Sequence, residues 1–343
     1  MSWQIMILFA GCLAVMAGFL HIVPTLTRPE IFFAVQVGPE FRRTAEGRAI
    51  LRQYRLIVWI STAAAILLSL AVGLPAVALA VEAAGILGAM VRAHAQALHH
   101  AHAPSPVVEV ELSAPPERLP GGPVVVLLPT LSLIGLGLWA TFNPNSLPAG
   151  FPIHWGFEGP DRWVTTTTRT VWGFLGTMAS VTLLLGGCAW AVLNWSRRIA
   201  TSGVAAAAES RFRHRMALMM VVFAYLCIAP AWFALLAPGV SGAMTVWGAV
   251  LVLVIVGFAI SLSRTGQGGG LAAARAGAPP AGDRTPDSAW KWGLVYVNSA
   301  DPAILVEKRL GIGYTLNLGN HWTWVILALL LAPVAIGLAL GLR

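Results

Sequence analysis

Long uncharged apolar runs constrain this chain more than any other feature of its sequence. A bilayer core about 30 Å thick is crossed by roughly 20 apolar residues in a helix. Eight runs of about that length occur, with one Glu as their only charged residue: 3–23, 56–72, 74–91, 124–142, 171–193, 216–237, 244–263 and 322–342. The sequence therefore predicts an all-α polytopic membrane protein with about eight transmembrane helices.

The composition excludes two other classes of protein. Hydrophobic residues make up 57% of the 343 residues and charged residues 10%, whereas a soluble globular domain has about 25% charged residues. A soluble fold cannot bury so much apolar surface, and a disordered chain needs the opposite composition. The three cysteines lie inside apolar runs, which argues against a disulfide framework or a zinc site.

The second and third runs are predicted to form a tight helical hairpin. A single helix over 56–91 would be far longer than the bilayer is thick, and Gly73-Leu74-Pro75 is typical of a turn. The first run is longer than the apolar part of a signal peptide, and no Lys or Arg precedes it. We therefore predict that the first run is retained as a transmembrane helix.

The basic residues predict the orientation of the helices. Of the 22 Lys and Arg residues, 19 fall in alternate loops, at 24–55, 92–123, 194–215 and 264–321. Basic loops remain in the cytoplasm, where they meet anionic lipid, so both termini are predicted to be extracytoplasmic. The lipid bilayer is then the partner that the net charge of +8 indicates, and no nucleic acid is needed to explain it.

These features divide the chain into six parts, each predicted from its composition and length. They are an N-terminal three-helix membrane region with cytoplasmic loops (1–123), a helix-loop-helix unit (124–193) with an outward loop (143–170), two further transmembrane helices (194–263), a flexible linker rich in Gly, Ala and Pro (264–289), a cytoplasmic β-rich module (290–320) and the last transmembrane helix (321–343).

The first cytoplasmic loop combines a β-prone stretch with a basic helix. Residues 31–37 are β-branched and aromatic, and a turn is predicted at Gly38-Pro39. Thr44 is placed to cap a helix that carries three arginines on one face and continues into the second span. We interpret this segment as a membrane-surface anchor.

Four histidines, His94, His99, His100 and His102, lie within nine residues. Neutral imidazole binds zinc and nickel, so a metal site is one interpretation. Such clusters also occur in unstructured linkers, and no acidic residue is placed to orient the rings. We favour the linker and predict no cofactor.

The outward loop contains the strongest candidates for a ligand site, which are His154, Trp155, Glu158, Asp161 and Trp163. Pro and Gly residues among them exclude a helix, so the histidine and the two acids converge only if the loop folds. The two tryptophans suit the aromatic belt of the membrane interface. Two interpretations stay open: the polar side chains bind a ligand or handle protons, since His titrates near neutral pH, or they cap the turns.

This loop resembles a known family. The pattern Leu-Pro, Ile-His-Trp and Gly-Pro-Asp-Arg-Trp between two apolar spans, over about 131–170, is similar to the bacterial membrane family called domain of unknown function 1648. That domain also occurs in immunity proteins that protect cells from a sporulation-delaying peptide toxin. The resemblance implies a location in the bacterial plasma membrane, a peptide or envelope ligand outside and a regulator in the cytoplasm.

After residue 289 the chain changes to short β-prone runs. Runs at 290–298 and 304–309, joined by Asn298-Ser299-Ala300-Asp301-Pro302, predict a hairpin. The pattern resembles the uncharacterised family 5808 over about 30 residues, through Trp290, Lys291, Tyr296, Asn298, Asp301, Lys308, Arg309, Gly311, Gly313 and Asn317. Lys308 and Arg309, beside Trp322 and Trp324, are predicted to anchor the module at the membrane surface.

Glu82 is the one acidic residue inside the predicted spans, near the middle of 74–91. A charged carboxylate there costs about 3 kcal/mol unless it is protonated or paired. We expect Glu82 to face other helices, with Ser132, Thr182 and Tyr225 as candidate neighbours. It either relays protons or ions, or bonds neighbouring helices as a neutral acid, and the second interpretation is favoured.

Three classes of function remain. We expect an envelope sensor or a peptide-toxin immunity-like protein, in which the outward loop meets the ligand and the cytoplasmic loops pass its state on. The alternative is a proton- or ion-coupled transporter that uses Glu82, although no inverted repeat is visible. A membrane-embedded enzyme has the least support because no catalytic motif is present, so no enzymatic activity is expected.

Overall fold

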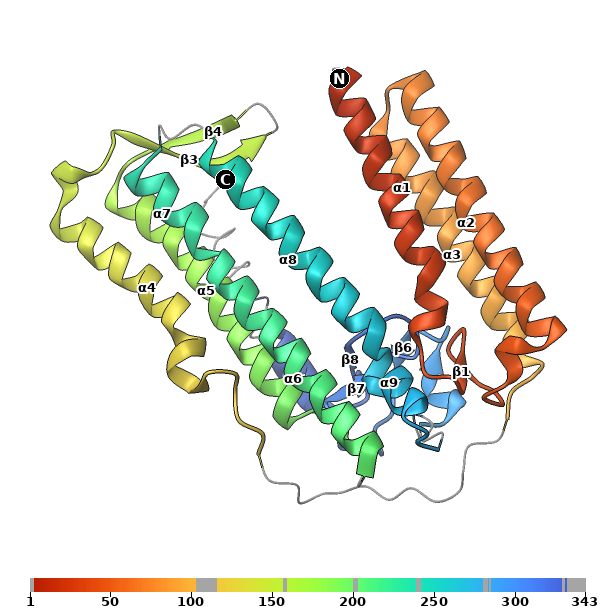
Figure 1. The fold of residues 1–343 in the computed structure, drawn as a ribbon. Helices are drawn as coiled ribbons and strands as arrows, with labels where there is room; N and C mark the ends of the chain where they lie inside the picture. The colour runs from red at the N-terminus through yellow and green to blue at the C-terminus, as the bar shows by residue number, and fades with distance from the viewer. Residues whose placement is uncertain are drawn as a thin grey trace. The chain divides into compact units, whose positions relative to one another are not determined.

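The computed structural model describes residues 3–102, 116–156, 159–199, 203–238, 242–279, 283, 285–328 and 331. Figure 1 shows its helices and strands. The helices are α1 (Trp3–Leu26), α2 (Ala45–Val72), α3 (Pro75–Leu98), α4 (Gly122–Phe142), α5 (Thr168–Asn194), α6 (Gly203–Leu226), α7 (Ile228–Leu236), α8 (Ala243–Thr265) and α9 (Gly270–Arg275). The strands are β1 (Ile31–Phe32), β2 (Val35–Gln36), β3 (Gly150–Gly156), β4 (Gly159–Thr165), β5 (Trp290–Lys291), β6 (Val295–Tyr296), β7 (Leu305–Glu307) and β8 (Tyr314–Leu316).

Seven helical stretches among the described residues are long and apolar enough to cross a membrane. They correspond to the first seven predicted spans and are Phe9–Leu26, Ala45–Val72, Pro75–Leu98, Gly122–Phe142, Thr168–Asn194, Gly203–Leu236 and Ala243–Arg275. The predicted eighth span lies mostly outside the described residues, and its described part, 321–328, is helical. The chain is therefore a multi-pass membrane protein built from helices, as predicted.

Apolar side chains on the helix surfaces fit this solvent. On α2, for example, Leu56, Ile60 and Leu67 are 57%, 59% and 67% exposed. A water-soluble protein rarely leaves so continuous an apolar surface uncovered, whereas lipid tails cover it without penalty. The exposed faces of the long helices are therefore the lipid-facing ones.

The predicted hairpin of α2 and α3 is confirmed, with both of its turn residues in the expected roles. Gly73 ends α2 in the left-handed conformation (φ 69°), and Pro75 is the first residue of α3. At the other end of α2, the Thr44 side chain accepts a hydrogen bond from the Gly47 amide at 3.1 Å, as predicted for the cap. Helices α2 and α3 approach closely at Gly85, where an added Cβ would lie 2.2 Å from the Ser61 Cβ.

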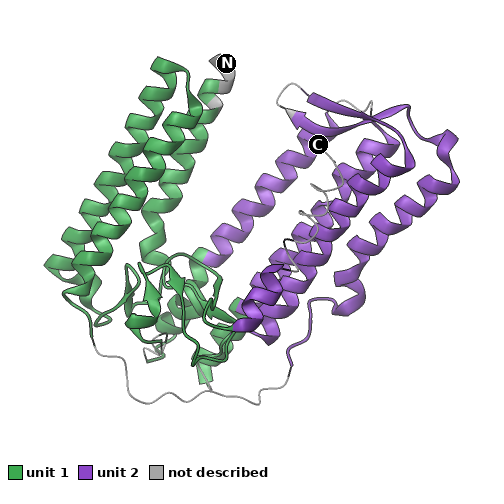
Figure 2. Cartoon of the chain, turned by 180° about the vertical axis from the view of Figure 1, so that it is seen from behind, with its two compact units in different colours: residues 1–112, 197–212, 263–320 green, residues 113–196, 213–262, 321–343 purple. Residues whose placement is uncertain are grey.

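Contacts within the chain separate it into two units, coloured in Figure 2: residues 1–112, 197–212 and 263–320 form unit 1, and residues 113–196, 213–262 and 321–343 form unit 2. In unit 1, α1, α2 and α3 pack side by side. Their core continues into the β1–β2 segment, where Phe32 and Phe33 are fully buried and the Phe33 ring lies 4.9 Å from that of Tyr54. This segment is therefore part of the core of unit 1.

Unit 2 packs α4, α5 and α7 around a second core. The β3–β4 hairpin closes this core through Phe151, which is fully buried and lies 5.5 Å from the Phe174 ring of α5. A capping box between Thr167 and Thr170 begins α5 directly after the hairpin. The hairpin is therefore fixed to the helices at its base.

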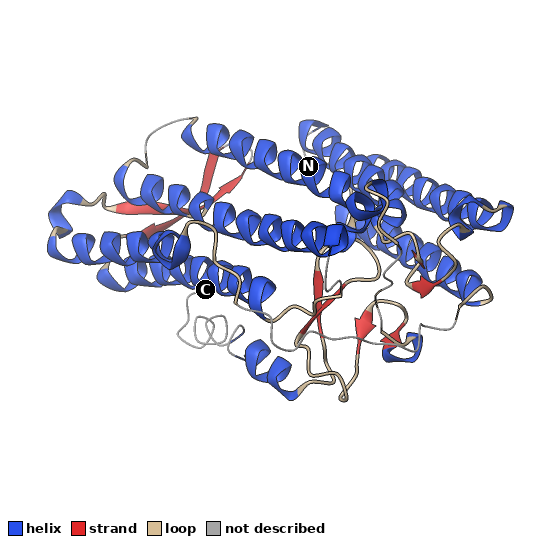
Figure 3. Cartoon of the chain, turned by 60° about the horizontal axis from the view of Figure 1, so that its bottom comes forward, coloured by secondary structure: helices blue, strands red, loops and turns tan. Residues whose placement is uncertain are grey.

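The strands form four two-stranded antiparallel sheets, β1–β2, β3–β4, β5–β6 and β7–β8. Figure 3 shows how short these strands are beside the helices. The hairpin predicted between 290–298 and 304–309 is wrong, because each run finds a nearer partner. Trp292 and Gly293, both with positive φ, close β5 onto β6, and β7 pairs with β8 instead.

The flexible linker predicted at 264–289 also differs from the structure. Helix α8 runs to Thr265, a 3₁₀ turn at Gln267–Gly269 follows, and α9 begins at Gly270. Gln267, Asp283 and Thr285 are buried. The glycines here permit close packing rather than chain flexibility. At Gly269, for example, an added Cβ would lie 2.5 Å from the Ala208 carbonyl oxygen.

Candidate functional sites

The β3–β4 hairpin brings two of the predicted loop residues together. His154 pairs with Arg162 across the sheet, and the register is irregular on both sides of His154. Such a bulge re-aims a side chain, and Nδ1 of His154 lies 2.6 Å from Oδ1 of Asp161. The loop thus folds so that the histidine and one acid converge, while Glu158 lies outside the described residues.

The pair is accessible to solvent on a hairpin whose base is packed. The side chains of His154 and Asp161 are 63% and 53% exposed. Trp155 packs against the core of unit 2, whereas Trp163 is half exposed. The hydrogen bond from His154 lowers the pKa of Asp161 below its ordinary value. A ligand that approaches the hairpin would therefore meet an aspartate, an imidazole and an indole.

Glu82 is fully buried between helices of unit 1. Its Oε1 lies 2.9 Å from Oγ1 of Thr62 on α2, and Oγ1 of Thr62 also lies 3.0 Å from the Val58 carbonyl oxygen. A hydroxyl has one proton, so both bonds are fully made at once only if Glu82 supplies the other proton. Its second oxygen, Oε2, has no hydrogen-bond partner among the described residues.

The candidate neighbours predicted for Glu82 have other partners. The indole of Trp232 donates to the Ser132 hydroxyl at 3.3 Å, the hydroxyls of Thr130 and Thr182 are 2.9 Å apart, and Tyr225 donates to the Val125 carbonyl at 2.8 Å. Thr62 was missed because helical periodicity alone does not tell which face of α2 meets α3. The neighbour of Glu82 is therefore a residue of the adjacent helix in the hairpin.

Three parts of unit 1 that are distant in sequence pack together, and one of them contains residues 290–320. We call the described residues of 28–43, 197–212 and 266–320 the polar module. Its predicted residue Arg309 is buried, which corrects the expectation that it anchors the module at the membrane surface. Arg309 pairs with the carboxylates of Asp283 and Asp287 and lies 5.2 Å from the centre of the Trp290 ring.

Arg309 also joins the N-terminal part of the module to the C-terminal part. It donates to the Ala34 carbonyl at 2.9 Å and to the Thr285 carbonyl at 2.6 Å. Gln36 donates to Asp283 Oδ1 at 2.7 Å. The turn of β1–β2 is thereby held against residues 283–290, and a guanidinium with five donors suits so many acceptors.

A second buried arginine makes a similar connection. Nε and Nη2 of Arg28 donate to the two carboxylate oxygens of Glu307 at 3.0 and 3.1 Å, and both side chains are buried. Burial lowers the pKa of Arg28, but the attraction and hydrogen bonds of Glu307 outweigh it, so the pKa is raised. The folded protein therefore stabilises the charged form of the Arg28 guanidinium.

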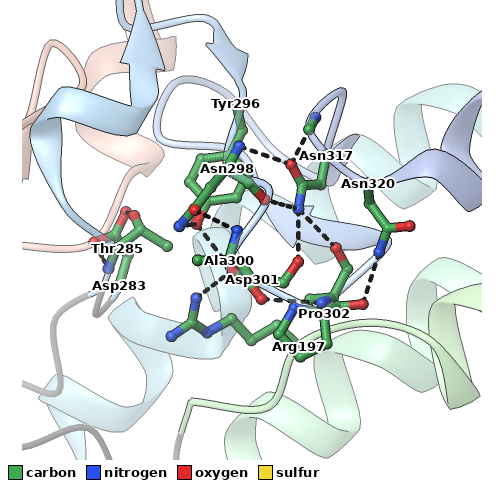
Figure 4. A network of polar contacts seen from close by, with 12 residues as sticks. Arg197, Asp283, Thr285, Tyr296, Asn298, Ala300, Asp301, Pro302, Asn317 and Asn320 are labelled. Atoms are coloured by element: carbon green, nitrogen blue, oxygen red, sulfur yellow. Dashed lines mark hydrogen bonds and ion pairs between the residues drawn. The ribbon is translucent and has the colours of Figure 1, made fainter.

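Asn317 is the centre of the network in Figure 4. Its Nδ2 lies within hydrogen-bond distance of the carbonyl oxygens of Asn298, Asp301 and Ala303, at 2.8 to 3.1 Å. Its Oδ1 accepts from the Asn298 and Gly319 amides at 3.0 Å. This fully buried side chain therefore fixes the loop between β6 and β7.

The same network reaches the segment between α5 and α6. Arg197 Nη1 lies 2.7 Å from Oδ2 of Asp301, and the Tyr296 hydroxyl donates to the same oxygen at 2.8 Å. Asn298 Nδ2 donates to the Tyr296 hydroxyl at 3.1 Å. Burial raises the pKa of Tyr296 to about 12. The predicted residues Tyr296, Asn298 and Asp301 thus hold the module together, with Arg197 as a partner that the sequence did not indicate.

The remaining predicted module residues are of two kinds. Gly311 and Gly313 have positive φ of 82° and 113°, and the amide and carbonyl of Gly313 both bond the buried Gln267 side chain. Both glycines are therefore turn residues. Lys291 and Lys308, by contrast, are exposed.

The four clustered histidines do not converge. His94 Nδ1 lies 2.8 Å from the Phe33 carbonyl, the His100 ring packs 4.6 Å from that of Phe41, and His99 and His102 are exposed. Among the described residues, no three His, Cys, Asp or Glu side chains are grouped to hold a metal ion. Three of these histidines instead contact the segment around β1–β2, and the third of them, His102, does so through its backbone amide, which donates to the Gln36 carbonyl at 2.9 Å.

Comparison with known proteins supports one of the two resemblances. The model of the family described as "Family of unknown function (DUF5808)" matches residues 300–324, which confirms the resemblance predicted for the C-terminal module. No curated protein and no solved structure matches the chain. The matched stretch begins in the loop fixed by Asn317 and contains both Glu307 and Arg309, the partners of the two buried ion-pair clusters. Residues 300–324 of this multi-pass membrane protein are therefore similar to the DUF5808 family.

Proposed function

We propose that the protein is an envelope sensor of the kind that gives immunity to a peptide toxin. In this proposal the β3–β4 hairpin faces outward and binds a peptide or envelope ligand, and the polar module faces the cytoplasm and passes the bound state to a regulator. The observation that carries the proposal is the solvent-exposed pair of His154 and Asp161, 2.6 Å apart on a packed hairpin.

Three further points support it. The pair lies in the loop that resembles domain of unknown function 1648, whose relatives include immunity proteins. The distribution of basic residues also supports a position of this loop outside the cytoplasm. An aspartate and an imidazole are also well suited to a cationic or polar peptide group, because charge-assisted hydrogen bonds are stronger than neutral ones. A bacterial plasma membrane location belongs to the same proposal.

A deletion strain challenged with envelope-active peptides tests the proposal. We expect the wild-type gene to restore protection, and His154→Ala and Asp161→Ala each to abolish it while the protein still reaches the membrane fraction. Thr165→Ala is the matched control, because Thr165 is an exposed residue at the other end of β4. Full protection by both His154→Ala and Asp161→Ala would remove the hairpin from the mechanism.

A proton- or ion-coupled transporter is the second candidate, and one observation favours it. A buried Glu82 carboxyl with an unpartnered oxygen is the arrangement of an ion or proton relay inside a membrane. Glu82→Gln should then eliminate pH-dependent flux in reconstituted vesicles. Absence of flux in both the wild-type protein and the variant would leave Glu82 with a purely structural role.

A further inference from the structure

The tip of the β5–β6 hairpin presents an uncovered indole in an unusual backbone conformation. Trp292 has φ 53° and the next residue, Gly293, has φ 71°. Asn, Asp and Gly are the usual residues with positive φ in such hairpin turns, and a bulky residue there is uncommon and strained. The Trp292 side chain is nevertheless 76% exposed, so no contact within the described protein compensates for the strain.

The β1–β2 hairpin, whose turn is one residue shorter, shows an aromatic turn residue that is covered. Its turn residues, Phe33 and Ala34, also have positive φ, of 46° and 67°. Phe33 is fully buried, and its ring lies 4.9 Å from that of Tyr54 on α2. An aromatic residue at the first turn position thus enters an apolar core in one hairpin, whereas its counterpart Trp292 is left uncovered by the described residues.

The depth of the β5–β6 tip relative to the spans follows from its contacts. A Cβ on Gly293 would lie 2.7 Å from the Ala34 Cβ and 2.9 Å from Nδ1 of His94. His94 is on α3, two residues beyond Arg92, the first charged residue after the apolar run of that helix. Two residues correspond to about 3 Å along a helix. The tip therefore lies at the level where the apolar part of α3 ends.

The chemistry of the tip suits that level. Tryptophan prefers the interface between hydrocarbon and water, because its ring is apolar and its N–H is polar. Lys291, directly before Trp292, is exposed and carries the charge that attracts anionic headgroups. Leu294, two residues after Trp292, is 42% exposed and adds apolar surface.

We propose that the β5–β6 tip is a lipid-binding surface, with the Trp292 indole inserted among the headgroups and the Lys291 ammonium at their phosphates. The polar module is then attached to the membrane surface by this hairpin, in addition to its covalent connections to the transmembrane helices. This contact is independent of the ligand proposed for the β3–β4 hairpin. It replaces Arg309, which is buried, as the membrane contact of the module.

Spin labelling in full-length protein tests the proposal. Cysteine is placed at 292 (Trp292→Cys) in a variant whose native Cys12, Cys188 and Cys227 are replaced by Ala, and a nitroxide is attached. The protein is reconstituted in vesicles of phosphatidylcholine and phosphatidylglycerol. We expect a higher ratio of oxygen to nickel-chelate accessibility at 292 than at the control Ala300→Cys, an exposed residue beyond the other end of β6.

A second measurement leaves the cysteines unchanged. Quenching of tryptophan fluorescence by lipids brominated near the headgroup should be weaker in Trp292→Phe than in the wild-type protein. Equal nickel-chelate accessibility at 292 and 300, together with unchanged bromolipid quenching, would refute the lipid contact and assign the surface to a protein partner instead. Misfolding is recognised separately. The label at position 300 lies in the same module but leaves the tip unchanged, so its signal reports whether the module is folded.

Discussion

Replacing Arg309 by Met should open the polar module at both hairpins at once. Met keeps an unbranched side chain of similar length but removes the charge and five donors. Asp283, which is buried, would keep its bonds to Gln36 and Thr285 but lose its cation. The Ala34 carbonyl would lose the donor that holds the β1–β2 turn.

The expected magnitude follows from the burial of the pair. Removing one partner of a buried ion pair costs about 3–5 kcal/mol, because the remaining charge stays in a medium of low polarity. At about 1.36 kcal/mol per factor of ten, this is an increase of about 10² to 10⁴ in the population of the open form. An exposed pair gives a contrast: Arg43 and Glu40 are 83% and 73% exposed, and such pairs contribute about 0–1 kcal/mol.

Hydrogen exchange of the protein in nanodiscs measures this opening. In Arg309→Met, the amides of Val37 and Val297, which bond the carbonyls of Glu30 and Ala289, should exchange faster together. The control Arg43→Met should leave both unchanged. Adding Asp283→Asn to Arg309→Met should restore part of the protection, because it removes the uncompensated charge.

Two results would contradict the reasoning about Arg309. Unchanged exchange of both amides would mean that the buried guanidinium contributes nothing to the module. Faster exchange near Val297 alone would mean that the bond to Ala34 does not couple the two hairpins. Loss of the whole protein from the membrane fraction is distinguished from both, because protection in α5 would then be lost as well.

Three further predictions concern the other sites. Glu82→Gln should keep the thermal midpoint in detergent close to that of the wild type because its amide group keeps a hydrogen bond with the Thr62 hydroxyl, whereas Glu82→Ala should lower it. Equal losses in the two variants would refute this role of the hydrogen bond. In an NMR titration, the pKa of Asp161 should rise toward its ordinary value when His154 is replaced by Ala. Because the pKa of Asp161 is lowered in the folded protein, its bond to His154 stabilises the hairpin at a pH above the unfolded pKa. This stabilisation is lost as the pH falls through the folded pKa. An unchanged Asp161 pKa in His154→Ala would refute the hydrogen bond. A cysteine at Asn145 should react with an impermeant thiol reagent in intact cells, and absence of labelling would reverse the predicted orientation.

The helical framework was predictable because its signals are local. Hydropathy over about 20 residues located the spans, and Gly73 with Pro75 located the turn between α2 and α3. Thr44 as a cap belongs to the same class of signal. The exclusion of a helix from the outward loop was also local, and it led to the expectation that His154 meets an acid only in a folded loop.

The polar module was not predictable in this way, because its bonds join residues far apart in the chain. Arg28 and Glu307 are separated by 279 positions, and Arg309 and Ala34 by 275. A single sequence contains no period or motif that pairs such residues. The glycine content of 264–289 was misleading, since glycine permits flexibility in a linker and close packing in a core equally well.

One hint to the module was present in the composition. In a chain with only 10% charged residues, the acids at 283 and 287 interrupt a stretch that we interpreted as a linker. Both of these acids bind the same arginine. In this chain the two acids, rather than the Gly and Pro residues around them, indicated the buried pairs of Arg309.

The pairing of Arg28 with Glu307 has a consequence for synthesis. Ribosomes add about 5–20 residues per second, so the 279 positions between the two residues take about 14–56 s to make. During that interval Arg28 is without the Glu307 carboxylate, because that part of the chain has not yet been made. The N-terminal helices thus enter the membrane before the surface that completes their loop, and a chain that stops short of β7 leaves a guanidinium without its carboxylate.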